Sequence, residues 1–119
     1  MIHGIGIDIV RNARIQRAVE AWGKRFLNRI FTEGELAYCF RRQDPYPSLA
    51  ARFAAKEAFV KAMGGWASMR WTDIEISNDR AGRPTIRVKQ EGGNQLRQAH
   101  VSLSHEKEYS IACVIIEKD

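Results

Sequence analysis

The chain opens with a strict alternation of residue types. The isoleucines of Ile5–Ile9 alternate with Gly4, Gly6 and Asp8, and this period of two predicts a half-buried β-strand. Asp8 therefore shares one face of the strand with two glycines, which leave room for something to approach the backbone. A charged side chain on that face is a candidate for chemistry.

Apolar residues at helical spacing follow the strand. The spacing predicts helices over Arg11–Trp22 and Lys24–Phe31, with Gly23 between them and Asn12 able to cap the first.

Two further helices are expected. Thr32 and Glu35 form a capping box, in which each side chain can satisfy the other residue's free amide, and a short helix should run from there to about Arg42. Ser48 is expected to cap a long helix that runs to Met63. This helix is apolar on nearly every side, so it is predicted to be the buried central helix.

The second half of the chain is predicted to be mostly strands. The strand-like segments are Asp73–Ser77, Thr85–Lys89, His100–His105 and Tyr109–Ile116, with a short helix placed over Glu91–Ala99. The last two strands are predicted to pair as a hairpin. The order of strand, helices and strands predicts a single α+β domain over residues 1–119, with helices packed on a mainly antiparallel sheet.

Composition narrows the classes of protein. With 119 residues, 45% hydrophobic and 28% charged, the chain is expected to be globular, and no apolar run approaches the ~20 residues of a membrane span. No signal peptide is recognised, and Cys39 and Cys113 have no metal-ligand spacing, so a cytoplasmic protein is expected. A net charge of +5 favours an acidic partner: nucleic acid, a phosphorylated small molecule or an acidic protein.

Asp8 and Glu57 are the strongest candidates for chemistry. Glu57 lies on the long helix among apolar neighbours, with Lys61 one turn further on. Two converging carboxylates suit Mg²⁺, which keeps several waters and accepts phosphate oxygens, and the Lys61 ammonium can reach the same phosphate. The structural alternative is that Glu57 and Lys61 form a surface ion pair while Asp8 caps a helix.

Two weaker candidates lie in the second half of the chain. Gly82, Arg83 and Pro84 form a basic turn that suits either a phosphate or a plain hairpin. His105 ends a predicted strand, where functional residues are common, although a lone histidine is more often structural.

Three motifs in order resemble one known family. Gly4–Val10, Arg52–Ala62 and Val101–His105 are together similar to the bacterial holo-acyl-carrier-protein synthases, the small type of 4′-phosphopantetheinyl transferase. The resemblance covers nearly the whole chain. It implies the fold of these transferases and a Mg²⁺-dependent transfer of phosphopantetheine from coenzyme A to a serine of apo-acyl carrier protein, which releases 3′,5′-ADP for lipid biosynthesis.

The resemblance also assigns roles to individual residues. Asp8 and Glu57 match the Mg²⁺ ligands, Lys61 matches a phosphate contact and His105 matches a residue near the pyrophosphate. The residues that match positions near the nucleotide are Arg52, Gly82, Arg83 and Pro84. Glu57 is the preferred base for the serine proton, directly or through a metal-bound water, with Asp8 second. The tryptophan of Gly64–Arg70 departs from the family pattern, so contacts of this loop with the substrate are left unassigned.

Partners follow from the same resemblance. It implies a homotrimer whose active sites are shared between neighbouring chains. Acyl carrier proteins are small and acidic, so Arg14, Arg17 and Arg25 are the preferred docking residues.

Two other classes of function remain open at this point: a basic module that binds RNA or DNA, and a Mg²⁺-dependent phosphohydrolase. The phenylalanines fall at core spacing rather than on an exposed stacking strand, which argues against nucleic acid.

Overall fold

The computed structural model describes residues 1–66, 68–89 and 98–118. The helices are α1 (Asn12–Trp22), α2 (Lys24–Ile30), α3 (Glu33–Cys39) and α4 (Tyr46–Met63), with a 3-10 turn, η1 (Trp71–Asp73). The strands are β1 (Ile2–Arg11), β2 (Ile74–Asn78), β3 (Pro84–Val88), β4 (Gln98–His105) and β5 (Tyr109–Glu117). The predicted order of strand, helices and strands is confirmed.

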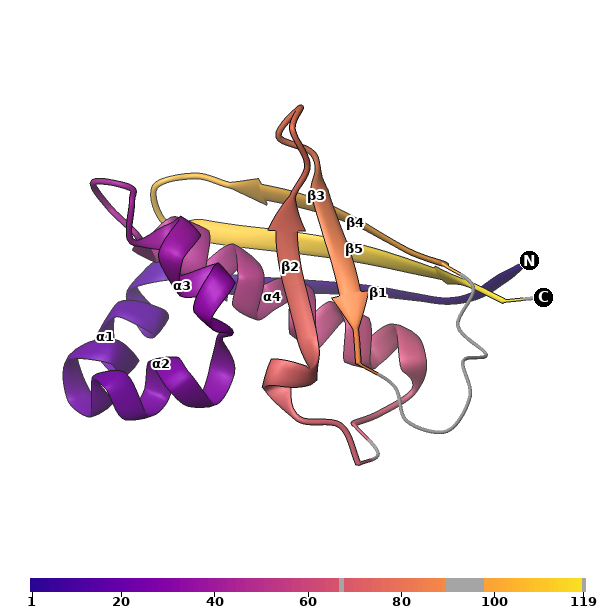
Figure 1. Cartoon of the computed structure of the whole chain (residues 1–119), viewed down its shortest axis with the longest axis horizontal. Helices are drawn as coiled ribbons and strands as arrows, with labels where there is room; N and C mark the ends of the chain where they lie inside the picture. Colours follow the sequence, from indigo (N-terminus) through magenta and orange to yellow (C-terminus); the bar gives the residue numbers. More distant parts are fainter. Residues whose placement is uncertain (67, 90–97, 119) are drawn as a thin grey trace.

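Two antiparallel sheets and a central helix form the core. One sheet has the order β1-β5-β4, and β2 pairs with β3 as a separate hairpin. Helix α4 packs across β1 and β5, and the hairpin lies beside β4 (Figure 1). Helices α1 to α3 gather at one end, while both chain termini lie at the other (Figure 1). This arrangement confirms the α+β class.

The face of β1 that carries the glycines packs directly on α4. A Cβ atom built on Gly4 would lie 1.9 Å from the carbonyl oxygen of Ala62, and one on Gly6 would lie 1.8 Å from that of Ala58. Only glycine allows two backbones to approach this closely. The sequence predicted such an approach to the backbone, and the approaching group is the central helix itself.

The isoleucine face of β1 points away from the core. Ile5, Ile7 and Ile9 are each more than half exposed. In the sheet they pair with Ile115, Cys113 and Ile111 of β5. The outer face of β1 and β5 is therefore apolar, while β4 adds the polar side chains of His100, Ser102 and Ser104 to the same face.

Two predicted caps are wrong. Asn12 is buried and its Nδ2 donates to the carbonyl oxygens of Glu106 at 2.8 Å and Lys107 at 3.2 Å, so it holds the β4–β5 turn instead of capping α1. Ser48 lies inside α4, which begins at Tyr46 with a proline in its first turn, a position where proline is well tolerated. The capping box of Thr32 and Glu35 is confirmed in both directions.

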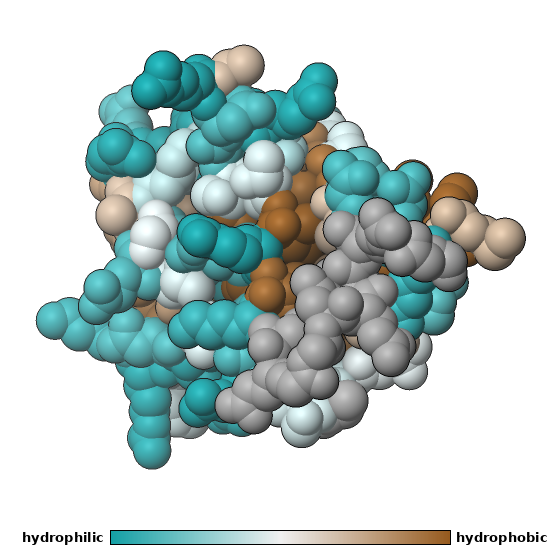
Figure 2. Space-filling view, turned by 45° about the vertical axis from the view of Figure 1, so that its right-hand side comes forward, coloured by the Kyte–Doolittle hydropathy of each residue, from teal (hydrophilic) through white to brown (hydrophobic). Residues whose placement is uncertain are grey.

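The buried face of α4 confirms the expected central helix. Among its interior residues are Leu49, Ala54 and Phe59, all with no exposed surface. The helix predicted over residues 91–99 falls mostly outside the described residues, and Gln98 and Ala99 belong to β4. No helix in the described part of the chain is long and apolar enough to cross a membrane. The face seen in Figure 2 shows a narrow apolar strip beside hydrophilic residues.

Candidate functional site

The structure brings Asp8, Glu57 and Lys61 together, and we call them the carboxylate cluster. Lys61 Nζ lies 3.1 Å from Asp8 Oδ1 and donates to the backbone carbonyl of Ile7 at 3.0 Å. Asp8 belongs to strand β1, so the alternative in which it caps a helix is wrong. Within the described residues, Lys61 forms its ion pair with Asp8 rather than with Glu57.

Local geometry explains why the cluster forms. Glu57 and Lys61 are one turn apart on α4, so both side chains leave the same side of the helix. Gly4 and Gly6 bring β1 against that helix, and Asp8 is the next residue on the same strand face. The close strand–helix contact therefore positions a carboxylate from each element.

The two carboxylates influence each other. The pKa of Glu57 is raised above its ordinary value, first by burial and then by the negative charge of Asp8, while Lys61 and Arg14 oppose the change. Two carboxylates that repel in a partly buried site favour a cation between them. The cluster therefore has the charge and the oxygen donors of a divalent-cation site.

Arg52 occupies a second region, at the beginning of α4. Its guanidinium is buried: Nη1 donates to Ser48 Oγ at 3.0 Å and Nη2 to Asn78 Oδ1 at 2.7 Å. Asn78 in turn donates from Nδ2 to the carbonyl of Gly82 at 3.0 Å. Arg52 thus connects α4 to the Gly82–Pro84 turn that the sequence grouped with it.

Two arginines that the sequence did not single out lie beside Arg52. The guanidinium carbons of Arg41, Arg42 and Arg52 lie 5.7, 4.9 and 4.2 Å from the ring centre of Tyr38. Within the described residues, Nε of Arg52 is a buried donor without a hydrogen-bond partner. This basic cluster, Arg41, Arg42 and Arg52 around Tyr38, suits a phosphate. The adjacent Arg41-Arg42 pair before the predicted helix break was its signal in the sequence.

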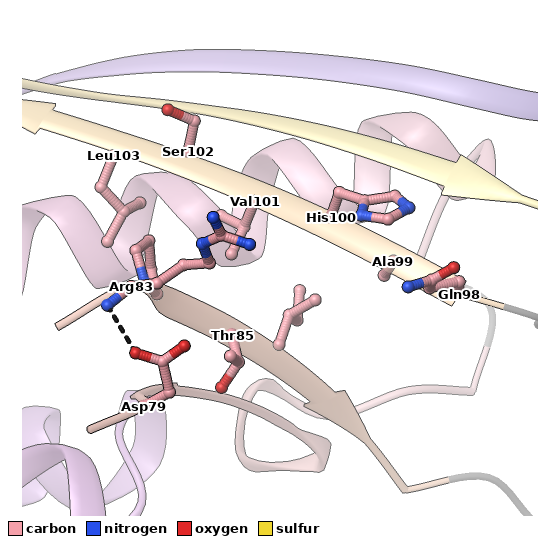
Figure 3. A pocket seen from close by; sticks show the side chains of 11 residues that line it. Asp79, Arg83, Thr85, Gln98, Ala99, His100, Val101, Ser102 and Leu103 are labelled. Carbon is pink, nitrogen blue, oxygen red and sulfur yellow. Dashed lines mark hydrogen bonds between the residues drawn. The ribbon is translucent and has the colours of Figure 1, made fainter. Parts of the chain in front are cut away.

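The Gly82–Pro84 turn borders a cavity. Gly82 has φ of 87°, a conformation that favours glycine, and Asp79 Oδ1 accepts from the amides of Ala81 and Arg83, both at 2.9 Å. These two amides are therefore engaged, and the turn offers a phosphate the guanidinium of Arg83. The cavity, about 590 Å³, lies between the hairpin and β4, and its lining includes Arg83, Pro84 and all of Gln98–Leu103 (Figure 3).

His105 lies on the opposite edge of the sheet from Asp8. Asp8, Ala112 and Leu103 share one rung across the three strands, and His105 is two residues beyond Leu103. Strands are spaced about 4.8 Å apart, so β1 and β4 are roughly 10 Å apart across the sheet. One chain therefore carries the carboxylate cluster at its β1 edge and His105 at its β4 edge.

The three predicted docking arginines occupy different surroundings. The guanidinium carbon of Arg14 lies 5.6 Å from the ring centre of Phe53, and its charge lowers the pKa of Glu57. The Arg14 side chain therefore extends from α1 toward the carboxylate cluster. Arg17 is exposed on α1.

Arg25 belongs to a hollow of about 440 Å³ on α1 and α2, which is lined by Trp22, Arg25, Phe26 and Arg29. We call these four residues the helical docking surface. Trp22 is 64% exposed, so a large apolar side chain is available for contact on this surface.

Comparison with known proteins places the chain in one family. A model of the 4′-phosphopantetheinyl transferase superfamily matches residues 4–114. The holo-[acyl-carrier-protein] synthase of Chloroherpeton thalassium is 48% identical over 118 residues, which cover 97% of this chain and 98% of that protein. The enzyme of the same name from Aquifex aeolicus is 44% identical over 119 residues, 96% of this chain and 98% of that protein.

Solved structures agree with the sequence relatives. The holo-(acyl-carrier-protein) synthase of Bacillus anthracis, in complex with CoA (3′,5′-ADP), superposes with a TM-score of 0.85 at 35% identity and covers 100% of this chain and 99% of that one. The Helicobacter pylori enzyme in complex with coenzyme A gives 0.86 at 32% identity, covering 95% and 99%.

Proposed function

The chain belongs to the 4′-phosphopantetheinyl transferase superfamily, among its holo-acyl-carrier-protein synthases, and we propose that it transfers phosphopantetheine from coenzyme A to a serine of apo-acyl carrier protein. The reaction is proposed to depend on Mg²⁺, to release 3′,5′-ADP and to serve fatty acid biosynthesis. The observation that carries this proposal is the carboxylate cluster, in which Asp8 and Glu57 meet beside Lys61.

The carboxylate cluster fits Mg²⁺. In the described residues no group of three or more His, Cys, Asp and Glu side chains could hold a metal ion. Mg²⁺, however, is typically held by one or two carboxylates, with water and substrate phosphate completing its shell. The mutual repulsion of Asp8 and Glu57 is what a bound cation would relieve. When bound there, Mg²⁺ would neutralise charge on the pyrophosphate of coenzyme A.

The chain's own residues supply the remaining chemistry. Lys61 donates a hydrogen bond to Asp8, so its ammonium would add a positive charge to that of Mg²⁺ where the pyrophosphate would lie. Glu57, whose pKa is raised by burial and by Asp8, is suited to accept the proton of the carrier serine. Asp8 remains the second candidate for this base. Transfer of this kind depends chiefly on in-line positioning and charge neutralisation.

Coenzyme A is proposed to bind across the hairpin side. The cavity between the hairpin and β4 would take the nucleotide, with Arg83 and Pro84 at its rim. The basic cluster beside it would hold the 3′-phosphate through its guanidiniums. His105 would approach the pyrophosphate from the end of β4.

A homotrimer would unite these parts. Asp8 and His105 lie on opposite edges of one sheet, so a head-to-tail ring of chains would place the β1 edge of one copy beside the β4 edge of the next. The exposed isoleucines of β1 give this contact an apolar surface to bury. The proposed assembly has three sites, each shared by two neighbours.

The carrier is proposed to dock on α1 and α2. Arg17 and Arg25 offer charge to an acidic partner, while Trp22 and Phe26 offer an apolar contact beside it. Arg14 lies nearer the carboxylate cluster, so it would act where the docked carrier reaches the chemistry.

One assay tests the proposed function. The protein is incubated with coenzyme A, Mg²⁺ and apo-acyl carrier protein, and the carrier is weighed by mass spectrometry while 3′,5′-ADP is quantified. A gain of one phosphopantetheine per carrier, matched by one 3′,5′-ADP and lost with EDTA, is expected. Asp8→Ala serves as the control and should be folded but inactive. Release of nucleotide without a heavier carrier would indicate a phosphohydrolase. If coenzyme A is not consumed at all, a module that binds RNA or DNA would be the remaining alternative.

A further inference from the structure

A fully buried ion pair lies beside the carboxylate cluster and is not used by the proposed chemistry. Lys56 immediately precedes Glu57, yet its side chain leaves α4 on another side and has no exposed surface. Lys56 Nζ lies 2.7 Å from Glu35 Oε1, and the Glu35 side chain is equally buried. A buried ammonium is costly unless all of its donors are satisfied.

All three donors of Lys56 have partners. Besides Glu35, Nζ donates to the carbonyl oxygen of Ile30 at 2.7 Å and to that of Trp71 at 3.1 Å. Ile30 is the last residue of α2, where the unpaired carbonyls of a helix end attract a positive charge. A single ammonium therefore joins α4 to the end of α2 and to η1.

Glu35 extends the same network to two more elements. Its Oε1 accepts at 2.8 Å from the amide of Thr32, the N-cap residue of α3, and its Oε2 accepts at 2.7 Å from the amide of Ile76 in β2. The Thr32 hydroxyl donates onward to Glu75. The pair thus holds α2, α3 and the β2–β3 hairpin at fixed places around α4.

The Lys56–Glu35 network lies between the helical docking surface and the carboxylate cluster, which the reaction must bring together. The helical docking surface is on α1 and α2, and the end of α2 is fixed by Lys56. Glu57 is the next residue along α4. The contact between Ile30 and Lys56 is therefore one link between the docking surface and Glu57, beside the direct packing of α1 on α4.

We propose that the buried Lys56–Glu35 pair is a positioning device for transfer, which sets where the helical docking surface presents the carrier serine relative to the carboxylate cluster. This inference rests on the proposed function. Both side chains are fully buried, so both would act through other groups. Small displacements of reacting groups are costly, and a shift of about 1 Å can lower a rate about 100-fold.

The test removes the pair while the binding surfaces stay intact. Lys56→Met keeps the length of the side chain without its charge. Because it leaves Glu35 buried and unpaired, the double variant Lys56→Met/Glu35→Leu is made as well, since apolar replacement of both partners is often tolerated. Val60→Ala is the matched control, because it shortens another buried side chain of α4 and leaves both charged groups of the pair in place.

The measurements separate binding from turnover. Thermal melting reports folding, calorimetry gives the Kd of coenzyme A and the active fraction, and a carrier whose acceptor serine is replaced by alanine gives the Kd of the carrier. The folded variants are expected to bind both ligands within about 3-fold of the parent while kcat falls about 10- to 100-fold. Val60→Ala should keep kcat per active molecule.

Each remaining outcome overturns the proposal. A folded double variant with the parent's kcat, a loss of kcat no larger than the loss of active protein, or the same loss in Val60→Ala would each do so. If neither pair variant folds, the pair is needed for the fold itself and the positioning role is dropped. Absence of transfer by the parent protein would instead refute the proposed function, because that result does not involve the variants.

Discussion

The backbone of Gly6 faces the carbonyl oxygen of Ala58 so closely that a Cβ atom on Gly6 would lie 1.8 Å from it. This contact joins β1 to α4 and places Asp8 near Glu57. The atoms that would collide belong to the backbone, so no side-chain rotation can relieve the overlap.

Gly6→Ala is therefore expected to lower the free energy of unfolding by about 3 kcal/mol or more, at the upper end of overpacking effects. Gly34→Ala is the matched control: its nearest neighbour is the flexible Glu75 carboxylate at 3.0 Å, and alanine favours the α3 helix. Urea unfolding measures both. Equal stability of the two variants would contradict the close contact of β1 with α4.

Much of the carboxylate cluster could be predicted from the sequence, because local patterns determine it. The alternation around Asp8 and the helical spacing of Glu57 and Lys61 each need only a few neighbouring residues. The wrong assignments have the opposite origin. Asn12 is a good capping residue by type, but the β4–β5 turn, almost a hundred residues away, takes its side chain.

Arg41, Arg42 and the Lys56–Glu35 pair were missed for the same reason. Lys56 reads as one more charge in an otherwise apolar helix, since its partners Ile30, Glu35 and Trp71 are 15 to 26 residues away in the chain. Arg41 and Arg42 form a candidate phosphate site only together with Arg52, and the fold brings the three guanidiniums together around Tyr38. Spacing within one segment does not report such contacts.

Glu57→Gln should stabilise the metal-free protein near neutral pH. Burial and the charge of Asp8 raise the pKa of Glu57 above its ordinary value of 4.5, so ionised Glu57 costs stability in the folded state. Below the unfolded-state pKa, Glu57 is protonated in both states and this cost is absent. The cost develops as pH rises through the raised folded-state pKa, so the parent loses stability over that range. In EDTA, the melting temperature of Glu57→Gln should exceed the parent's at neutral pH, and the difference should shrink toward pH 4. A Glu57→Gln variant less stable than the parent at neutral pH would contradict the repulsion between the carboxylates.

Arg42→Ala should impair recognition of the 3′-phosphate. The basic cluster would lose one of three guanidiniums, so the KM for coenzyme A is expected to rise about 10-fold, as for the loss of one charge-assisted hydrogen bond. The KM for dephospho-coenzyme A, which lacks that phosphate, should change little. Steady-state kinetics with both substrates decide, and equal increases would remove the basic cluster from phosphate binding.

Arg17→Glu should weaken the carrier specifically. Arg17 is exposed on α1, so reversal of its charge is expected to raise the KM for the acidic carrier about 10-fold and to flatten its salt dependence. The KM for coenzyme A should stay constant, the reverse of the pattern for Arg42→Ala. Arg14→Glu should differ from both and reduce kcat as well, because Arg14 also acts on Glu57. If Arg17→Glu leaves carrier kinetics and their salt dependence unchanged, docking on α1 is wrong.

Complementation between two inactive variants tests the shared site most directly. Glu57→Ala damages the β1 edge and His105→Ala damages the β4 edge of the same sheet. In a head-to-tail ring, a Glu57 from one chain meets a His105 from its neighbour, so a mixed assembly contains some intact sites. Random mixing of equal amounts should restore about a quarter of the sites, because each site needs the undamaged edge from both neighbours. The two variants are refolded together and assayed for transfer, with each refolded alone as the control. Light scattering should show three chains per particle in every sample. A mixture as inactive as its parts, in particles that contain both chains, would show that each site is built within a single chain.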